Sequence, residues 1–139
     1  RRAFIRHTQS RVRVAAARDD LPVTVLLACP EVEMWLIADW AHTFQAVYGP
    51  EQAILSPAIR RPVMASGEAF GCPPRPSGGC TTKLRRFIAE EVGRLLPGRR
   101  YRPAYEGVTM LEQAHPDRVA QSCPVVFRPA WLELLQQRD

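Results

Sequence analysis

The feature that most constrains the fold is an apolar run, residues 22–29, that leads directly into a segment with helical spacing. The run reads Pro-Val-Thr-Val-Leu-Leu-Ala-Cys and does not alternate between apolar and polar residues. Such a pattern is typical of a strand that is buried on both faces of a parallel or mixed sheet. Pro30 then fits the first position of a helix that continues through Trp35 and Leu36 to about His42. The junction therefore predicts an α/β fold.

Three acidic residues, Glu31, Glu33 and Asp39, follow this predicted strand. Sheets of this kind usually carry their functional residues at the carboxyl ends of strands, and carboxylates are the ligands that Mg²⁺ prefers. The three residues are therefore candidate metal ligands. Glu31 and Glu33 stand about 200° apart on an ideal helix, so both face one site only if one of them precedes the helix. In the alternative interpretation, Glu31 and Glu33 place negative charge at the N-terminus of the helix, and Asp39 only makes hydrogen bonds near the C-terminal end of that helix.

The spacing of apolar residues predicts further helices. Residues 1–18 form an amphipathic helix, and residues 83–96 form a second one that Pro97-Gly98 ends. Shorter helices are expected over 108–114 and from 122–124 to about 135, while 43–48 either extend the junction helix or begin another. Residues 56–80 are rich in Pro, Gly and Ser and are expected to form a long loop.

Composition indicates one globular domain with a basic surface. The chain has 139 residues, is 46% hydrophobic and carries a net charge of +5 from 19 Lys and Arg residues, so it has enough apolar residues for one core. Lys83, the sole lysine, is a candidate for stabilising phosphate charge or is simply an exposed helix residue. The candidate nucleic-acid contacts are Arg85, Arg86, Arg99 and Arg100. Two solvated helix faces are the alternative, because no aromatic residues interleave with these arginines.

Cysteine usage and hydropathy indicate a cytoplasmic protein. The four cysteines, Cys29, Cys72, Cys80 and Cys123, are scattered, and the spacing of Cys72 and Cys80 is wider than a zinc knuckle requires. We therefore expect no zinc and reduced thiols, with a Cys72–Cys80 disulfide left open. No apolar run approaches the ~20 residues of a transmembrane helix, and no secretory signal opens the chain, so we expect neither secretion nor a membrane partner.

Four segments together suggest a family. Pro30 to Asp39 reads Pro-Glu-Val-Glu-Met-Trp-Leu-Ile-Ala-Asp, and it is followed by Lys83, by Tyr101 to Pro103 with Gly107, and by Cys123 to Phe127. In this order the sequence resembles an uncharacterised bacterial family of TOPRIM-like proteins, the domain of unknown function 4276 family. Residues 57–79 have no counterpart in that pattern.

The resemblance implies a Rossmann-like sheet and Mg²⁺- or Mn²⁺-dependent phosphodiester cleavage, with Glu33 and Lys83 as catalytic residues. It also implies a role in bacterial anti-phage defence beside a companion AAA- or ABC-type ATPase. The family's first glutamate and its Asp-x-Asp motif have no counterpart upstream of Pro22. The chain is therefore expected to be a single TOPRIM-like domain or its C-terminal fragment. The alternative function is a non-catalytic module that binds nucleic acid or an ATPase partner.

Overall fold

The computed structural model describes residues 2–26, 28, 31–69 and 84–137. Every regular element in these ranges is helical and none is a strand, so the predicted α/β fold with a partly parallel sheet is wrong. The elements are α1 (Arg2–Ala16), α2 (Glu33–Ala38), α3 (Trp40–Tyr48), η1 (Gly49–Glu51), α4 (Gln52–Leu55), α5 (Arg60–Ser66), η2 (Gly67–Ala69), α6 (Leu84–Leu95), η3 (Pro103–Gly107), α7 (Val108–Gln113), α8 (Pro116–Ser122) and α9 (Phe127–Gln136).

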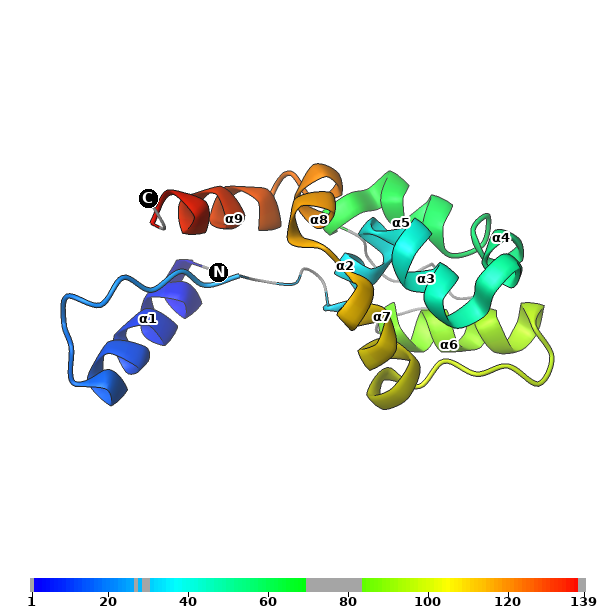
Figure 1. Ribbon diagram of the computed structural model, residues 1–139, viewed down its shortest axis with the longest axis horizontal. Coiled ribbons are helices and arrows are strands. Elements are labelled where there is room, and N and C mark those ends of the chain that lie inside the picture. The colour runs from blue at the N-terminus through cyan, green and yellow to red at the C-terminus, as the bar shows by residue number, and fades with distance from the viewer. Residues whose placement is uncertain (1, 27, 29–30, 70–83, 138–139) are drawn as a thin grey trace, which may run out of the picture.

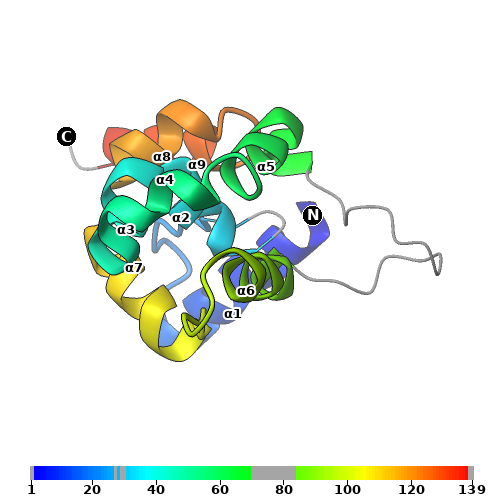
Figure 2. The same ribbon diagram turned by 90° about the vertical axis from the view of Figure 1, so that its right-hand side faces the viewer.

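The short helix α2 forms the centre of the core. It contacts α3, α5, α6, α7 and α8, which surround it in both views of the molecule (Figures 1 and 2). Met34, Leu36 and Ile37 of α2 are almost completely buried. The surrounding helices contribute side chains such as Phe44 and Ile88, neither of which is exposed to solvent. A helix that is apolar on nearly every side is expected at such a position.

The junction helix breaks at Asp39, which separates α2 from α3. Asp39 has φ −102° and ψ 39°, outside the α-helical region. The buried Thr43 hydroxyl donates to the carbonyl oxygens of Leu36 at 2.5 Å and Asp39 at 3.1 Å. This hydroxyl therefore supports the break, and residues 43–48 belong to the second of two helices.

Residues 22–26 and 28, the described part of the strand expected over 22–29, have no regular secondary structure. A strand satisfies its backbone groups by pairing with a second strand, and the described part of the chain provides none. Side chains of α1 take over part of this role. Gln9 donates to the carbonyl oxygen of Val23 at 2.7 Å, and Arg13 donates to that of Leu21 at 2.9 Å. The apolar run thus lies along a helix instead of within a sheet.

Helix α1 lies to one side of the core, as predicted for an amphipathic helix but with little burial. None of its described side chains is fully buried. Ile5 of α1, Val25 and Pro129 of α9 line a cavity of about 170 Å³, and the Thr24 hydroxyl donates to the side-chain oxygen of Gln137 at 3.3 Å. The segment after α1 therefore connects α1 to α9 (Figure 1).

The described part of the predicted loop, residues 56–69, is largely helical because it contains α5 and η2. Residues 70–83 lie outside the described residues. Several prolines of this chain stand at the start of helices instead of in loops. Pro50 lies at the start of η1, Pro62 in the first turn of α5, and Pro116 at the start of α8. Proline is compatible with a first helical turn because the N–H that it lacks has no partner within the helix there. Helix α8 was not predicted, and α9 begins at Phe127 instead of at 122–124.

Glu68 of η2 holds the start of α9. Its carboxylate accepts hydrogen bonds from the backbone N–H groups of Val125, Val126 and Phe127, at distances of 2.5 to 2.9 Å. These groups lie at the start of α9. The first N–H groups of a helix have no acceptor within the helix itself. A side chain 57 to 59 residues away in the sequence therefore provides the cap.

Candidate functional site

Glu33 lies at the start of α2 with only 3% of its surface exposed. The Tyr101 hydroxyl donates to its Oε1 at 3.3 Å. Both residues border a cavity of about 200 Å³ whose other walls, including Leu36 and Val108, are mostly apolar. Burial raises the pKa of Glu33, and the nearby negative charge of Glu31 raises it further, against hydrogen bonds from its own backbone and from Tyr101. Glu33 is therefore a carboxyl group in a largely apolar pocket.

Glu31 has a different environment. It is half-buried, and its Oε2 accepts a hydrogen bond from the backbone N–H of Arg85 at 3.0 Å. This bond joins the segment before α2 to the first turn of α6. Lys83, the predicted catalytic lysine, lies outside the described residues.

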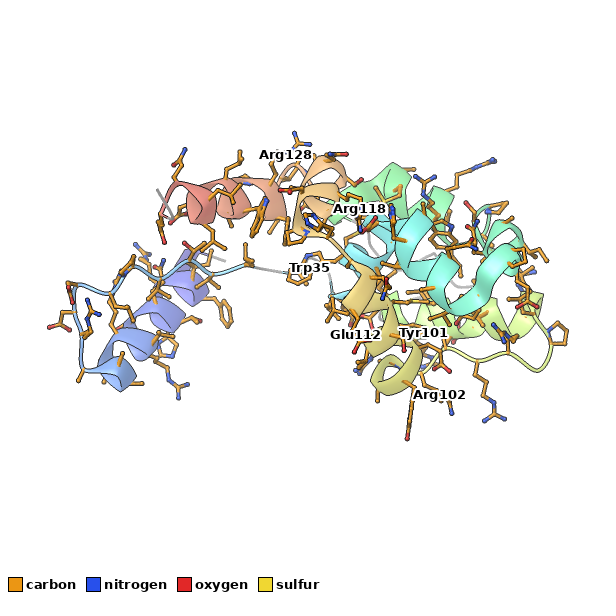
Figure 3. All side chains as sticks on the ribbon, viewed as in Figure 1. Trp35, Tyr101, Arg102, Glu112, Arg118 and Arg128 are labelled. Carbon is orange, nitrogen blue, oxygen red and sulfur yellow. The ribbon has the colours of Figure 1, made fainter. Side chains whose placement is uncertain are left out.

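Asp39 is buried within a network of donors. Its carboxylate accepts from Arg118 Nε at 2.7 and 2.8 Å, from the backbone N–H of His115 at 3.0 Å, and contacts His42 Nδ1 at 2.7 Å. Burial pushes the pKa of Asp39 upward, but the hydrogen bonds from Arg118, His115 and His42 outweigh burial and hold the pKa below its usual value. Asp39 therefore joins α2 and α3 to the start of α8, where Figure 3 labels its partner Arg118.

The three predicted metal ligands thus have three different sets of neighbours. The Asp39 carboxylate is already neutralised by a guanidinium, which would repel a divalent cation, and Glu33 lies in a largely apolar cavity. Within the described ranges, no three His, Cys, Asp or Glu side chains come together in a group that could hold a metal ion. These three residues therefore do not fit the predicted Mg²⁺ or Mn²⁺ site.

Among the cysteines, only Cys123 belongs to the described residues. It is buried and unpaired, and burial, with a smaller effect of Glu68, raises the pKa of its thiol to about 12. Cys29, Cys72 and Cys80 lie outside the described residues, as does any disulfide between the last two. The Cys123 thiol therefore stays protonated at neutral pH and packs within the core.

The predicted nucleic-acid contacts divide into two kinds. Arg86 pairs with Glu90 at 2.9 Å, and Arg99 pairs with Glu51 at 3.3 Å. Arg85 and Arg100 are exposed, and neither side chain has a hydrogen bond or ion pair within the described part of the chain. Two of the four guanidinium groups are thus available to an external anion without breaking an ion pair.

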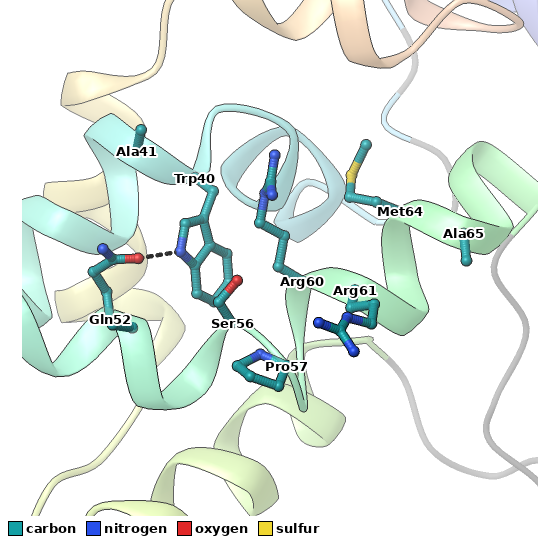
Figure 4. A pocket seen from close by; sticks show the side chains of 10 residues that line it. Trp40, Ala41, Gln52, Ser56, Pro57, Arg60, Arg61, Met64 and Ala65 are labelled. Atoms are coloured by element: carbon teal, nitrogen blue, oxygen red, sulfur yellow. Dashed lines mark hydrogen bonds between the residues drawn. The ribbon is translucent and has the colours of Figure 1, made fainter.

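Two clefts with arginines at their edges open on the surface. The larger, of about 850 Å³, lies between the start of α3, α4 and α5 and is lined by residues including Trp40, Gln52, Arg60 and Arg61 (Figure 4). The second, of about 450 Å³, is lined by Val47, Tyr48, Gly98, Arg99, Arg100, Arg102 and Glu106. Tyr48, which lines the second cleft, precedes η1 in the sequence, and Gln52, which lines the larger one, follows it.

The larger cleft was not predicted, because Arg60 and Arg61 lie within the loop expected over residues 56–80. The Trp40 indole N–H donates to the side-chain oxygen of Gln52, which fixes the cleft wall. The available signal was Pro62, since a proline after two arginines and before Val63 and Met64 is compatible with the first turn of a helix.

Comparisons with protein-family models, with curated proteins and with solved structures found no match for this chain. The family resemblance, the role in anti-phage defence, the companion ATPase and the cytoplasmic location therefore remain predictions. None of the described helices is long and apolar enough to cross a membrane.

Proposed function

We propose that this chain is a non-catalytic module that binds nucleic acid through arginines at the two clefts beside η1. The observation that carries the proposal is the distribution of charge. Arginines with exposed guanidinium groups border both clefts, whereas the carboxylates of Asp39 and Glu68 are held in internal hydrogen bonds. Positive charge in a concave surface attracts the phosphate backbone.

The larger cleft is lined by two arginines that are consecutive in the sequence. Arg60 and Arg61 lie in the first turn of α5, are exposed, and form no side-chain hydrogen bond or ion pair with any residue that the structure describes. Trp40 is only 5% exposed, so it cannot stack on a base. The contact proposed here is therefore with phosphates, which gives affinity without sequence preference.

The second cleft adds an arginine of fixed orientation. Arg99 donates to the carbonyl oxygen of Val47 at 2.8 Å, and its guanidinium carbon lies 5.5 Å from the centre of the Tyr48 ring. Arg100 beside it has no side-chain partner within the described ranges. Phosphates at the larger cleft would meet Arg60 and Arg61, and phosphates at the second cleft would meet Arg100.

Cleavage is not part of this proposal, because Glu31, Glu33 and Asp39 contact α6, the Tyr101 loop and α8 respectively. Phosphodiester cleavage needs its charged groups around one reacting phosphate. The carboxylates have no such common site among the described residues.

Fluorescence anisotropy of labelled single-stranded DNA, duplex DNA and RNA over a range of salt concentrations tests the proposal. We expect binding that weakens steeply with salt, and we expect Arg60→Ala/Arg61→Ala to weaken it about tenfold and to reduce the salt slope by about 2. The matched control is Arg6→Ala/Arg11→Ala, which removes the same charge from exposed positions on α1.

Equal losses in the two double variants would overturn the assignment, because net charge alone would then explain binding. Cleavage of the same nucleic acids on addition of Mg²⁺ or Mn²⁺ would overturn the non-catalytic part of the proposal. No salt-sensitive binding to any of the three would overturn the proposal as a whole.

A further inference from the structure

The cavity beside Glu33 has the features of a small-ligand site that is separate from the arginine clefts. It measures about 200 Å³ and lies between the start of α2, the Tyr101 loop, η3 and α7. Apolar residues such as Leu36, Val108 and Leu111 supply most of its walls, and Glu33 and the Tyr101 hydroxyl supply its polar groups. Binding pockets for small molecules typically combine apolar walls with a few fixed polar groups.

The charges around Glu33 are not balanced inside the cavity. Among the residues that the structure describes, no basic side chain lines it, and the one side-chain hydrogen bond that Glu33 receives comes from the neutral Tyr101 hydroxyl at 3.3 Å. Outside the cavity, Glu31 adds negative charge and Arg85 adds a weaker positive influence. A buried carboxylate without a cation partner is costly in free energy. A ligand that brings a positive charge removes that cost.

From this geometry we propose that the cavity binds a small primary alkylammonium compound, with its ammonium group at Glu33 and Tyr101 and its alkyl chain against Leu36, Val108 and Leu111. The ammonium donates hydrogen bonds to the carboxylate. The apolar walls suit an alkyl chain, which favours an amine over a metal ion or a polyamine with several charges.

Gly107 sets the size of the cavity. A Cβ atom at this position would lie 3.1 Å from the Tyr101 hydroxyl oxygen and 3.8 Å from Pro103 Cβ. Its backbone φ is −63°, so the absence of a side chain serves close approach rather than an unusual backbone conformation. An added methyl group would therefore displace Tyr101 and narrow the space beside Glu33.

Ligand-observed NMR with the full chain tests the proposal, with butylammonium and butan-1-ol as matched probes. We expect wild-type protein to bind butylammonium about tenfold more tightly than the alcohol, which has nearly the same shape but no charge. Glu33→Gln is expected to abolish this preference, and Gly107→Ala to weaken both probes. Equal binding of the two probes to wild-type protein, or an unchanged preference in Glu33→Gln, would overturn the proposal.

A pH series on wild-type protein gives a test that needs no variant. Affinity for butylammonium should rise as Glu33 loses its proton, while affinity for the alcohol should stay constant, and two parallel pH profiles would contradict the proposal. A lysine side chain carries the same group, so Nα-acetyl-lysine methylamide forms a further arm. Tighter binding of butylammonium supports a free amine, and tighter binding of the lysine compound contradicts the free-amine assignment.

Discussion

Asp39→Ala is expected to lower the free energy of unfolding by about 2–4 kcal/mol. The substitution removes the acceptor for Arg118 and for the His115 N–H, and it leaves a cavity between α2 and α8. Because the Arg118 side chain is 37% exposed, water can solvate the freed guanidinium, which keeps the loss below that of a fully buried pair. Urea unfolding followed by circular dichroism measures the change, and a loss below about 0.5 kcal/mol would contradict the role of this network.

The stability that Asp39 contributes is expected to decrease in acid. The folded-state pKa of Asp39 lies below its usual value of 3.8, so its stabilisation is fully present above pH 3.8 and disappears as the pH falls through the lower folded-state pKa. The difference between wild-type protein and Asp39→Ala should therefore shrink in acid.

Glu33→Gln is the matched control on the same helix, because the pKa of Glu33 shifts in the opposite direction. Its folded-state pKa lies above the usual 4.5, so its stabilisation is present below pH 4.5 and is lost as the pH rises through the higher folded-state pKa. At pH 7 the glutamine variant should be at least as stable as the wild type. Similar destabilisation of both variants at neutral pH would contradict the opposite pKa shifts of Asp39 and Glu33.

Glu68→Ala is expected to cost about 2 kcal/mol, near the upper end for loss of a helix cap. The loss is large because a charged acceptor serves three N–H groups, two of which belong to the buried residues Val126 and Phe127. It should also weaken the packing of Phe127 against Trp35, whose ring centres lie 5.0 Å apart. Urea unfolding and near-UV circular dichroism of the aromatic groups measure the two effects.

Glu112→Ala is the control for this experiment. Glu112 is an exposed carboxylate on α7 with no hydrogen bond or ion pair to any described residue (Figure 3), so its removal should change stability by less than about 0.5 kcal/mol. If the Glu68 and Glu112 variants have the same stability, Glu68 does not hold α9 in place.

Local spacing predicted α1 and α6 because an amphipathic helix records its periodicity in consecutive residues. It failed for residues 22–26 and 28, since a short apolar run is compatible with a strand or with a segment packed along helices. Pro62 of α5 fell within the segment expected to be a loop, although the first turn of a helix accepts proline.

The candidate site was predictable in part. Glu33 and Asp39 were selected because they follow the predicted strand, and both are buried although the strand is absent from the described residues. Their partners, Tyr101 and Arg118, lie 68 and 79 residues further along the chain, where no local pattern identifies them. The opposite pKa shifts of the two carboxylates come from those partners and from burial.

The position of α1 beside the core has a consequence for unfolding. Its side chains are at most half-buried, and side-chain donors such as Gln9 and Arg13 connect it to the segment that follows. Opening α1 therefore exposes little of the apolar surface around α2, and its free energy is expected to be a fraction of that for the whole chain. Amide protons of α1 should exchange with solvent through local fluctuations while those of α2 await global unfolding. Helix α1 would then open locally, before the cooperative unfolding of the core around α2 that the urea experiments follow.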